Sequence, residues 1–112
     1  IPGMQFYVLM DKDTSSIAAS FCNIMQYNGA ALLAGEPLRH NALKYGETVG
    51  ARYGISGLYL TVSTVEFDEY SHAVDGVLMP DITIPYIAQD YLTGRDAMLD
   101  KLLEIIKRDI KN

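Results

Sequence analysis

The stretch "QFYVLMDKDTSSIAASFCNIMQYNGAALLAG", residues 5–35, contains the pattern that decides the fold. It opens at 5–10 with a short apolar run rich in strand-forming residues, which predicts a β-strand. The polar cluster at 11–14 suits a turn and a helix cap, and Asn28-Gly29 is typical of a helix end. The run at 30–34 predicts a second, buried strand. This order of strand, helix and strand indicates an α/β fold.

The predicted helix carries two kinds of apolar position. Four residues fall on one helical face: Ile17, Phe21, Ile24 and Met25. Three small residues would let the helix approach a neighbouring element closely: Ala18, Ala19 and Cys22.

Further along the chain, the sequence predicts a loop at 35–47, because this segment holds two glycines, a proline and mixed charges. Strands are predicted at 48–53 and 58–65 around a turn at 54–57. The polar segment 68–76 is predicted to be a loop.

The C-terminal third is predicted to be extended at 77–86, followed by a short helical turn at 88–92. Asp96 is positioned to cap a last helix. The apolar stripe predicted for that helix consists of Leu99, Leu102, Leu103, Ile106 and Ile110.

The composition limits the class of protein. Of the 112 residues, 49% are hydrophobic, which is typical of one small packed domain and not of a disordered chain. The net charge of −5 argues against nucleic-acid binding, since no surplus of basic side chains is present to neutralise phosphates. No apolar run is long enough for a transmembrane segment. Because the chain opens with Ile-Pro-Gly rather than Met, we expect it to be a fragment or a processed product.

The serine pair after Thr14 admits two interpretations. Ser15 and Ser16 are typical N-cap residues, and helix capping alone would explain them. A hydroxyl in the first helical turn also lies beside free backbone N–H groups, which can stabilise an oxyanion. A nucleophilic serine would in addition need a general base.

The stretch "VLMDKDTSSIAASFCNIMQYNGAALLAGEP" resembles the catalytic region of the tail-specific, or carboxyl-terminal processing, serine peptidases. In that family a strand leads into a T-x-S turn, the serine opens a helix, an asparagine ends it, and a short strand leads to a Gly-Glu pair. The matching residues here are Thr14, Ser16, Asn28 and Gly35-Glu36-Pro37. The later stretches "SGLYLTVST" and "DGVLMPDITI" resemble the strands that follow, so the resemblance covers nearly all of the chain.

This resemblance implies a fold and an activity. Residues 1–112 would form a single domain, the C-terminal portion of a peptidase catalytic domain with a ClpP/crotonase-like superhelix of short strands and two main helices. The parent would be a serine-type endopeptidase acting on unfolded or C-terminal protein segments in the bacterial cell envelope or periplasm. An upstream part, with one wall of the oxyanion hole and a peptide-binding module, would complete it.

The resemblance also implies that Ser16 is the nucleophile and that a lysine is the base. The family's lysine lies six residues after the glycine of the Gly-Glu pair, where this chain has Asn41, and an amide cannot accept the serine proton. The glutamate often found three residues after the nucleophile is replaced by Ala19. Activity is therefore expected to be impaired. Lys44 is the candidate substitute base, and a solvated surface lysine is the alternative interpretation.

The other candidate residues have simpler interpretations. His40 and His72 are expected in solvated loops, and Cys22 is expected to be an inert buried thiol. Glu36 is expected to anchor its loop, while Arg39 offers a charge for a peptide carboxylate. No His or Cys pair has metal-ligand spacing, and neither the residues nor the resemblance points to a cofactor.

Two further hypotheses compete with an active peptidase. The first is a catalytically inactive homologue that serves as a peptide-binding or structural module, because Asn41 and Ala19 stand where acid–base residues are expected. The second is a homodimer, in which unpaired strand edges are covered by another copy.

Overall fold

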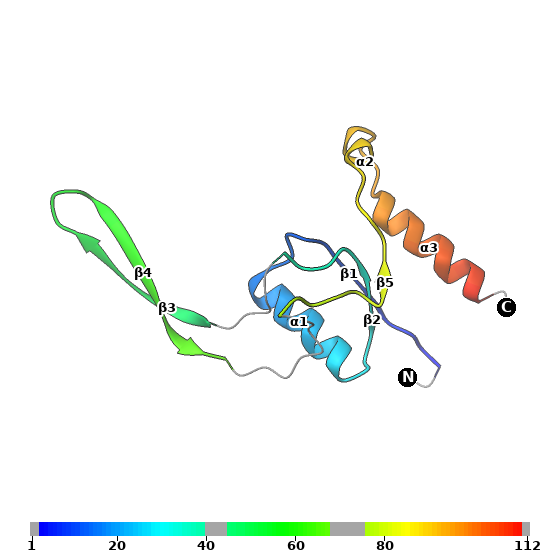
Figure 1. The fold of residues 1–112 in the computed structure, drawn as a ribbon, viewed down its shortest axis with the longest axis horizontal. Helices are drawn as coiled ribbons and strands as arrows, with labels where there is room; N and C mark the ends of the chain where they lie inside the picture. The colour runs from blue at the N-terminus through cyan, green and yellow to red at the C-terminus, as the bar shows by residue number, and fades with distance from the viewer. Residues whose placement is uncertain (1–2, 40–44, 68–75, 111–112) are drawn as a thin grey trace.

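The computed structural model describes residues 3–39, 45–67 and 76–110. The elements follow one another as β1 (Tyr7–Met10), α1 (Ser16–Tyr27), β2 (Leu32–Gly35), β3 (Tyr45–Tyr53), β4 (Leu58–Glu66), β5 (Ile82–Thr83), α2 (Ala88–Leu92) and α3 (Ala97–Asp109). Figure 1 shows their arrangement. The predicted α/β class is confirmed, with α1 and α3 as the two main helices. None of the helices in the described ranges is long and apolar enough to cross a membrane.

A small parallel sheet with the order β1-β2-β5 lies at the centre of residues 3–39 and 76–110, which we call the body. Met10 is in register with Gly35, and Ala34 is in register with Ile82. Within the described residues β1 pairs only with β2, so β1 forms an edge of the sheet.

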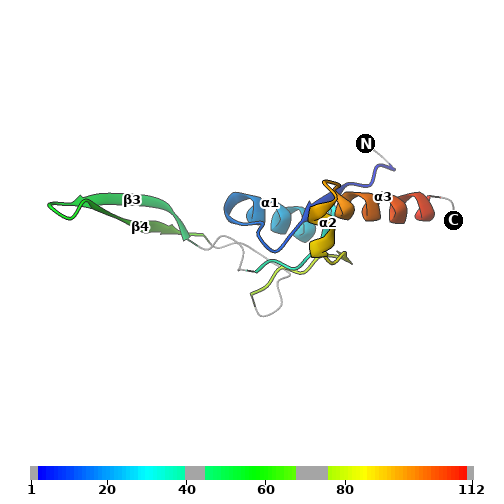
Figure 2. The same ribbon diagram turned by 90° about the horizontal axis from the view of Figure 1, so that it is seen from above.

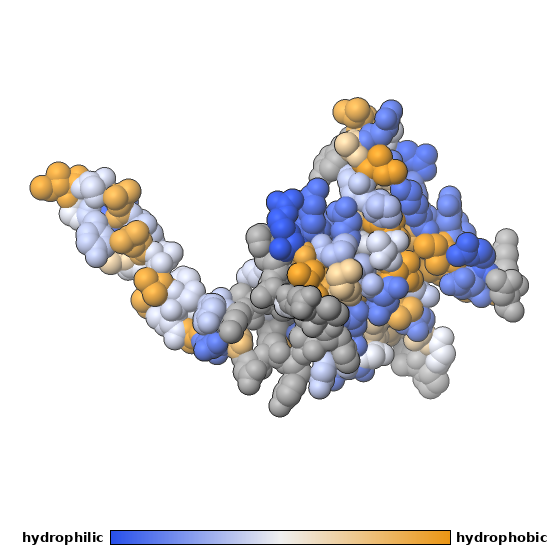
Figure 3. Space-filling view, in the orientation of Figure 1, coloured by the Kyte–Doolittle hydropathy of each residue, from blue (hydrophilic) through white to orange (hydrophobic). Residues whose placement is uncertain are grey.

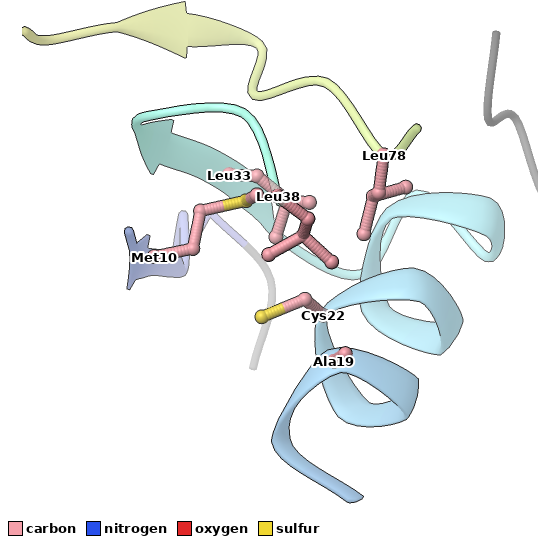
Figure 4. Close-up of a cluster of buried hydrophobic side chains, with 6 residues drawn as sticks. All are labelled: Met10, Ala19, Cys22, Leu33, Leu38 and Leu78. Atoms are coloured by element: carbon pink, nitrogen blue, oxygen red, sulfur yellow. The ribbon is translucent and has the colours of Figure 1, made fainter. Parts of the chain in front are cut away.

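Helix α1 packs on one face of this sheet. The buried cluster on that side, drawn in Figure 4, contains Met10, Ala19, Cys22, Leu33, Leu38 and Leu78. Of the three small residues predicted to allow a close approach, Ala19 and Cys22 are buried against the sheet, whereas Ala18 is exposed. The apolar stripe of α1 lies elsewhere: Ile17, Phe21 and Ile24 are 75%, 52% and 52% exposed.

Helix α3 packs on the opposite face. The α1 cluster contains Leu33 and the α3 cluster contains its neighbour Ala34, and neighbouring strand residues point to opposite sides of a sheet. Its buried cluster joins Met98 and Leu102 to Ala34 and Ile84. The predicted α3 stripe is therefore only partly right. Of its members, Leu102 is buried and Ile106 is half-buried, whereas Leu99, Leu103 and Ile110 are exposed.

Strands β3 and β4 form an antiparallel hairpin that extends away from the body (Figures 1 and 2). We call residues 45–67 the arm. The described molecule measures 65 × 36 × 27 Å and its radius of gyration is 18.0 Å, against about 13 Å for a compact domain of about 100 residues. The hairpin begins at Tyr45, earlier than predicted, because the first residues of β3 pair with the end of β4.

Candidate active site at the start of helix α1

The turn between β1 and α1 is held by Asp11 and Thr14. The Asp11 N–H donates to Thr14 Oγ1 at 3.0 Å, and the Thr14 hydroxyl donates to Asp11 Oδ1 at 2.9 Å. The Asp13 N–H donates to the same carboxylate oxygen at 3.0 Å. The Thr14 hydroxyl is thus used to close the turn, which fixes where the chain enters the helix.

Ser15 is the N-cap of α1 by position, but its side chain makes no capping hydrogen bond. Its backbone is extended, and its carbonyl accepts from the N–H of Ala18 at 3.2 Å. Because no hydroxyl of this pair caps the helix, the N-cap interpretation does not explain the two serines.

Ser16 has a left-handed backbone, with φ of 55°. Residues with a Cβ seldom adopt this conformation, and those that do are concentrated in functional sites and tight turns. The residue is exposed at the first position of α1, directly after an extended residue. Among the described residues, no group forms a hydrogen bond with its hydroxyl. The chain therefore presents an accessible hydroxyl beside the first N–H groups of a helix.

The segment after β2 lies next to this turn. The Glu36 N–H donates to the Met10 carbonyl at 3.1 Å, and the Arg39 N–H donates to the Lys12 carbonyl at 3.2 Å. The Arg39 guanidinium lies 3.6 Å from an Asp13 carboxylate oxygen, an exposed ion pair of small energetic value. The sequence suggested Arg39 as a partner for a peptide carboxylate. In the structure its acidic neighbour is Asp13 of the turn.

The Gly35-Glu36 pair has a structural role in the body. Gly35 is buried against the Met10 carbonyl, with φ of 132°. The Glu36 carboxylate accepts from the Tyr86 N–H at 3.2 Å and so ties the end of β2 to the chain that follows β5. The expectation that Glu36 anchors its loop is confirmed.

The predicted general base lies outside the described residues. Lys44 and the substituted position Asn41 lie outside the described residues, as do His40 and His72. Ala19 is 1% exposed and packs in the cluster beneath α1, so its Cβ points at the sheet. A glutamate at that position would have to enter the apolar core.

A shallow open hollow of about 510 Å³ lies at the carboxyl end of β1, and sequence reasoning did not identify it. The hollow combines residues far apart in sequence: Met10, Asp11, Thr14, Tyr86, Arg95 and Asp96 are among those that line it. Ligands of α/β sheets commonly bind at the carboxyl ends of strands. Its charged groups already have partners, since Arg95 pairs with Asp100 at 2.7 Å and Asp96 accepts from the Leu99 N–H.

Cys22 is buried in the cluster beneath α1, as expected from the sequence. Burial raises the pKa of its thiol, so the reactive thiolate is disfavoured at neutral pH. In the described ranges no group of three or more His, Cys, Asp or Glu side chains is arranged to hold a metal ion.

Comparisons of the chain with protein-family models, with curated proteins and with solved structures find no match. The site therefore rests on the local geometry around Ser16.

Proposed function

We propose that this chain is the C-terminal portion of the catalytic domain of a serine peptidase of the carboxyl-terminal processing type, with a ClpP/crotonase-like fold. Ser16 is the nucleophile, and the substrates are unfolded or C-terminal protein segments. The parent protein acts in the bacterial cell envelope or periplasm. Its activity is impaired because Asn41 stands where the family places the basic lysine.

The left-handed backbone of Ser16 is the observation that carries this proposal. A hydroxyl needed only for capping would accept from a backbone N–H of the first helical turn. Here the capping position makes no such bond, and the next residue adopts a backbone conformation that L-residues rarely adopt. Such a conformation persists where the surroundings enforce it, and here a strand, a hydrogen-bonded turn and a helix enclose it.

The chemistry requires a proton acceptor and oxyanion donors. In the proposed reaction, the Ser16 oxygen attacks the scissile carbonyl while its proton passes to an uncharged amine, for which Lys44 is the candidate in this chain. The first N–H groups of α1 would stabilise the negative charge that develops on the carbonyl oxygen. The remaining donors would come from the upstream part of the parent.

The test compares two serine variants of the full-length parent protein. Ser16→Ala is expected to abolish hydrolysis of an unstructured peptide, by a factor of at least about 100. Ser15→Ala is the matched control, because Ser15 is the exposed neighbour without a capping bond, and it is expected to retain activity. Equal rates for Ser16→Ala and the wild type would refute the proposal. If Lys44 is the base, Lys44→Ala removes activity as completely as Ser16→Ala.

A second candidate function is a catalytically inactive homologue that binds peptide termini or stabilises an assembly. It is favoured by the burial of Ala19, which leaves no space for a second acidic group behind Ser16, and by Asn41. An active-site serine probe separates the two candidates. Rapid covalent labelling of the wild type that is absent in Ser16→Ala supports the peptidase, whereas no labelling supports the inactive homologue.

A further inference from the structure

The arm has one face formed by apolar residues alone over three consecutive cross-strand pairs. Residues directly opposite each other in a hairpin lie on the same face. In the observed register these pairs are Tyr53–Leu58, Ala51–Leu60 and Val49–Val62. We call these six residues the arm face. Its five larger side chains are between 55% and 66% exposed.

The other face of the arm carries two aromatic rings that lie over glycines, together with polar residues. The ring of Tyr59 lies over Gly50, and the ring of Phe67 lies over Gly46, where an added Cβ would overlap each ring. The paired residues Thr48 and Ser63 also lie on this face and are polar. The hairpin is therefore amphipathic, and the arm face is its more apolar side.

No element in the described ranges covers the arm face, because the hairpin points away from the body in both views (Figures 1 and 2). The space-filling view shows apolar residues along the arm, apart from those of the body (Figure 3). An isolated two-stranded hairpin is marginally stable in water. A second layer packed on the arm face would supply the missing burial.

We propose that the arm face is covered by the arm face of a second copy of this chain, in a two-fold symmetric, antiparallel packing. This inference does not depend on the chemistry of Ser16. It concerns a surface on a different part of the molecule.

The area supports this choice of partner. At the observed exposure each large side chain presents on the order of 100 Å², so a pair of arm faces buries about 1,000 Å². This reaches the lower limit of about 1,000 Å² for specific interfaces. Antiparallel packing adds the fully exposed tip residue Ile55, which would lie over the base of the partner's arm.

The charges support the same arrangement. The acidic residues of the arm are Glu47 and Glu66, and both lie at the base of the hairpin. In an antiparallel pair, the two bases lie at opposite ends of the interface, so the acidic groups of the two copies stay apart. A parallel pair would place them side by side, at a cost.

The experiment is sedimentation velocity of the full 112-residue chain over a concentration series, with two lysine variants of neighbouring residues. Val62→Lys places a charge in the centre of the arm face, twice in each dimer, and is expected to raise the dissociation constant at least about tenfold. Ser63→Lys places the same charge on the opposite face and is expected to change it less than about twofold. Val62→Thr keeps the β-branched shape and should weaken the dimer by an intermediate factor, even if Val62→Lys unfolds the hairpin.

The orientation is tested with a spin label on Ile55→Cys at the tip, where the buried Cys22 does not compete for the reagent. An antiparallel dimer places the two tips about 30 Å apart, the length of a nine-residue strand. Three results would overturn the proposal. They are a monomer at every concentration, a dimer that both lysine variants weaken equally, and tips that lie in contact. A monomer would assign the arm face to another partner, such as the upstream part of the parent.

Discussion

The body and the arm are both built from strands with apolar residues, yet only the body buries them. Every sheet face of the body is covered by a helix, and Leu33, Ala34 and Leu78 have no exposed surface. The arm, residues 45–67, contains no buried residue. Its hydrogen-bonded ladder is longer than either strand pair of the body.

This difference separates two contributions to stability. Backbone pairing gives a hairpin its shape, but exchange with water makes each hydrogen bond worth only about 1 kcal/mol. Apolar burial requires a second layer, and within the described ranges only the body has one. The body should therefore respond strongly to substitutions at its tight contacts, and the monomeric arm should respond weakly.

The largest effect is expected from Gly35→Ala. The added Cβ would overlap the Met10 carbonyl oxygen, and φ of 132° is a conformation that alanine rarely adopts. Because neither strand can move without breaking the ladder, we expect a loss of more than about 4 kcal/mol of unfolding free energy. Urea unfolding followed by circular dichroism measures it.

Gly54→Ala is the matched glycine control in the arm. An added Cβ at Gly54 meets no atom within 4 Å, so little change is expected. If Gly35→Ala proved as mild as Gly54→Ala, β1 and β2 would not be held at the observed spacing. The body would then be no more sensitive than the arm, even at the close contact between Gly35 and the Met10 carbonyl.

The second effect is the difference between two leucine truncations. Leu33→Ala empties a fully buried site and should cost about 3 kcal/mol, within the range for buried leucines. Leu60→Ala, measured at concentrations below dimer formation, should cost less than about 1 kcal/mol, because more than half of that side chain is exposed. A large loss for Leu60→Ala in the monomer would mean that part of the same chain covers the arm face.

The third effect concerns Asp81, which lies just before β5 and links it to α1 and β2. Its carboxylate accepts from the Leu33 N–H at 2.7 Å and from the Gln26 side chain at 3.1 Å. Asp81→Ala leaves a part-buried N–H without its acceptor, so we expect a loss of about 2 kcal/mol. Asp81→Asn keeps one acceptor oxygen and should restore part of the loss.

Asp109→Ala is the control for Asp81. Asp109 is exposed, and among the described residues its ion-pair partner is Arg108 at 3.9 Å, so its removal should be nearly neutral. Equal losses for Asp81→Ala and Asp109→Ala would show that the carboxylate of Asp81 does not hold the sheet to α1.

The sequence predicts those features that depend on local pattern. The turn at 54–57 and the Asp96 cap of α3 are confirmed, because each depends on residues close together in the chain. The packing side of α1 is different. Its large apolar residues give the stronger helical stripe, but the sheet is approached by small residues, and periodicity alone does not show which side has a neighbour.

The candidate site also has one feature that the sequence predicts and others that it does not. The placement of Ser16 at a helix start was predicted, since it follows from the strand, turn and helix order. Its left-handed backbone has no sequence signal, because Gly, Asn and Asp are the residues typical of that conformation. The hollow beside Thr14 also has none, because it combines β1 with Arg95, which is distant in sequence.

The smallest effect tests whether α3 belongs to the same cooperative unit as the sheet. Asp96 accepts from the Leu99 N–H at 3.0 Å, so Asp96→Ala should cost about 1 kcal/mol, and Asp96→Asn should cost much less. Ser15→Ala, at the capping position of α1 that makes no such bond, should be nearly neutral. Because Met98 and Leu102 pack on Ala34 and Ile84, the loss of the cap should lower the unfolding midpoint of the whole body, while the NMR signals of the arm stay unchanged. A shift confined to helix signals would instead show that α3 unfolds independently of the sheet that it covers.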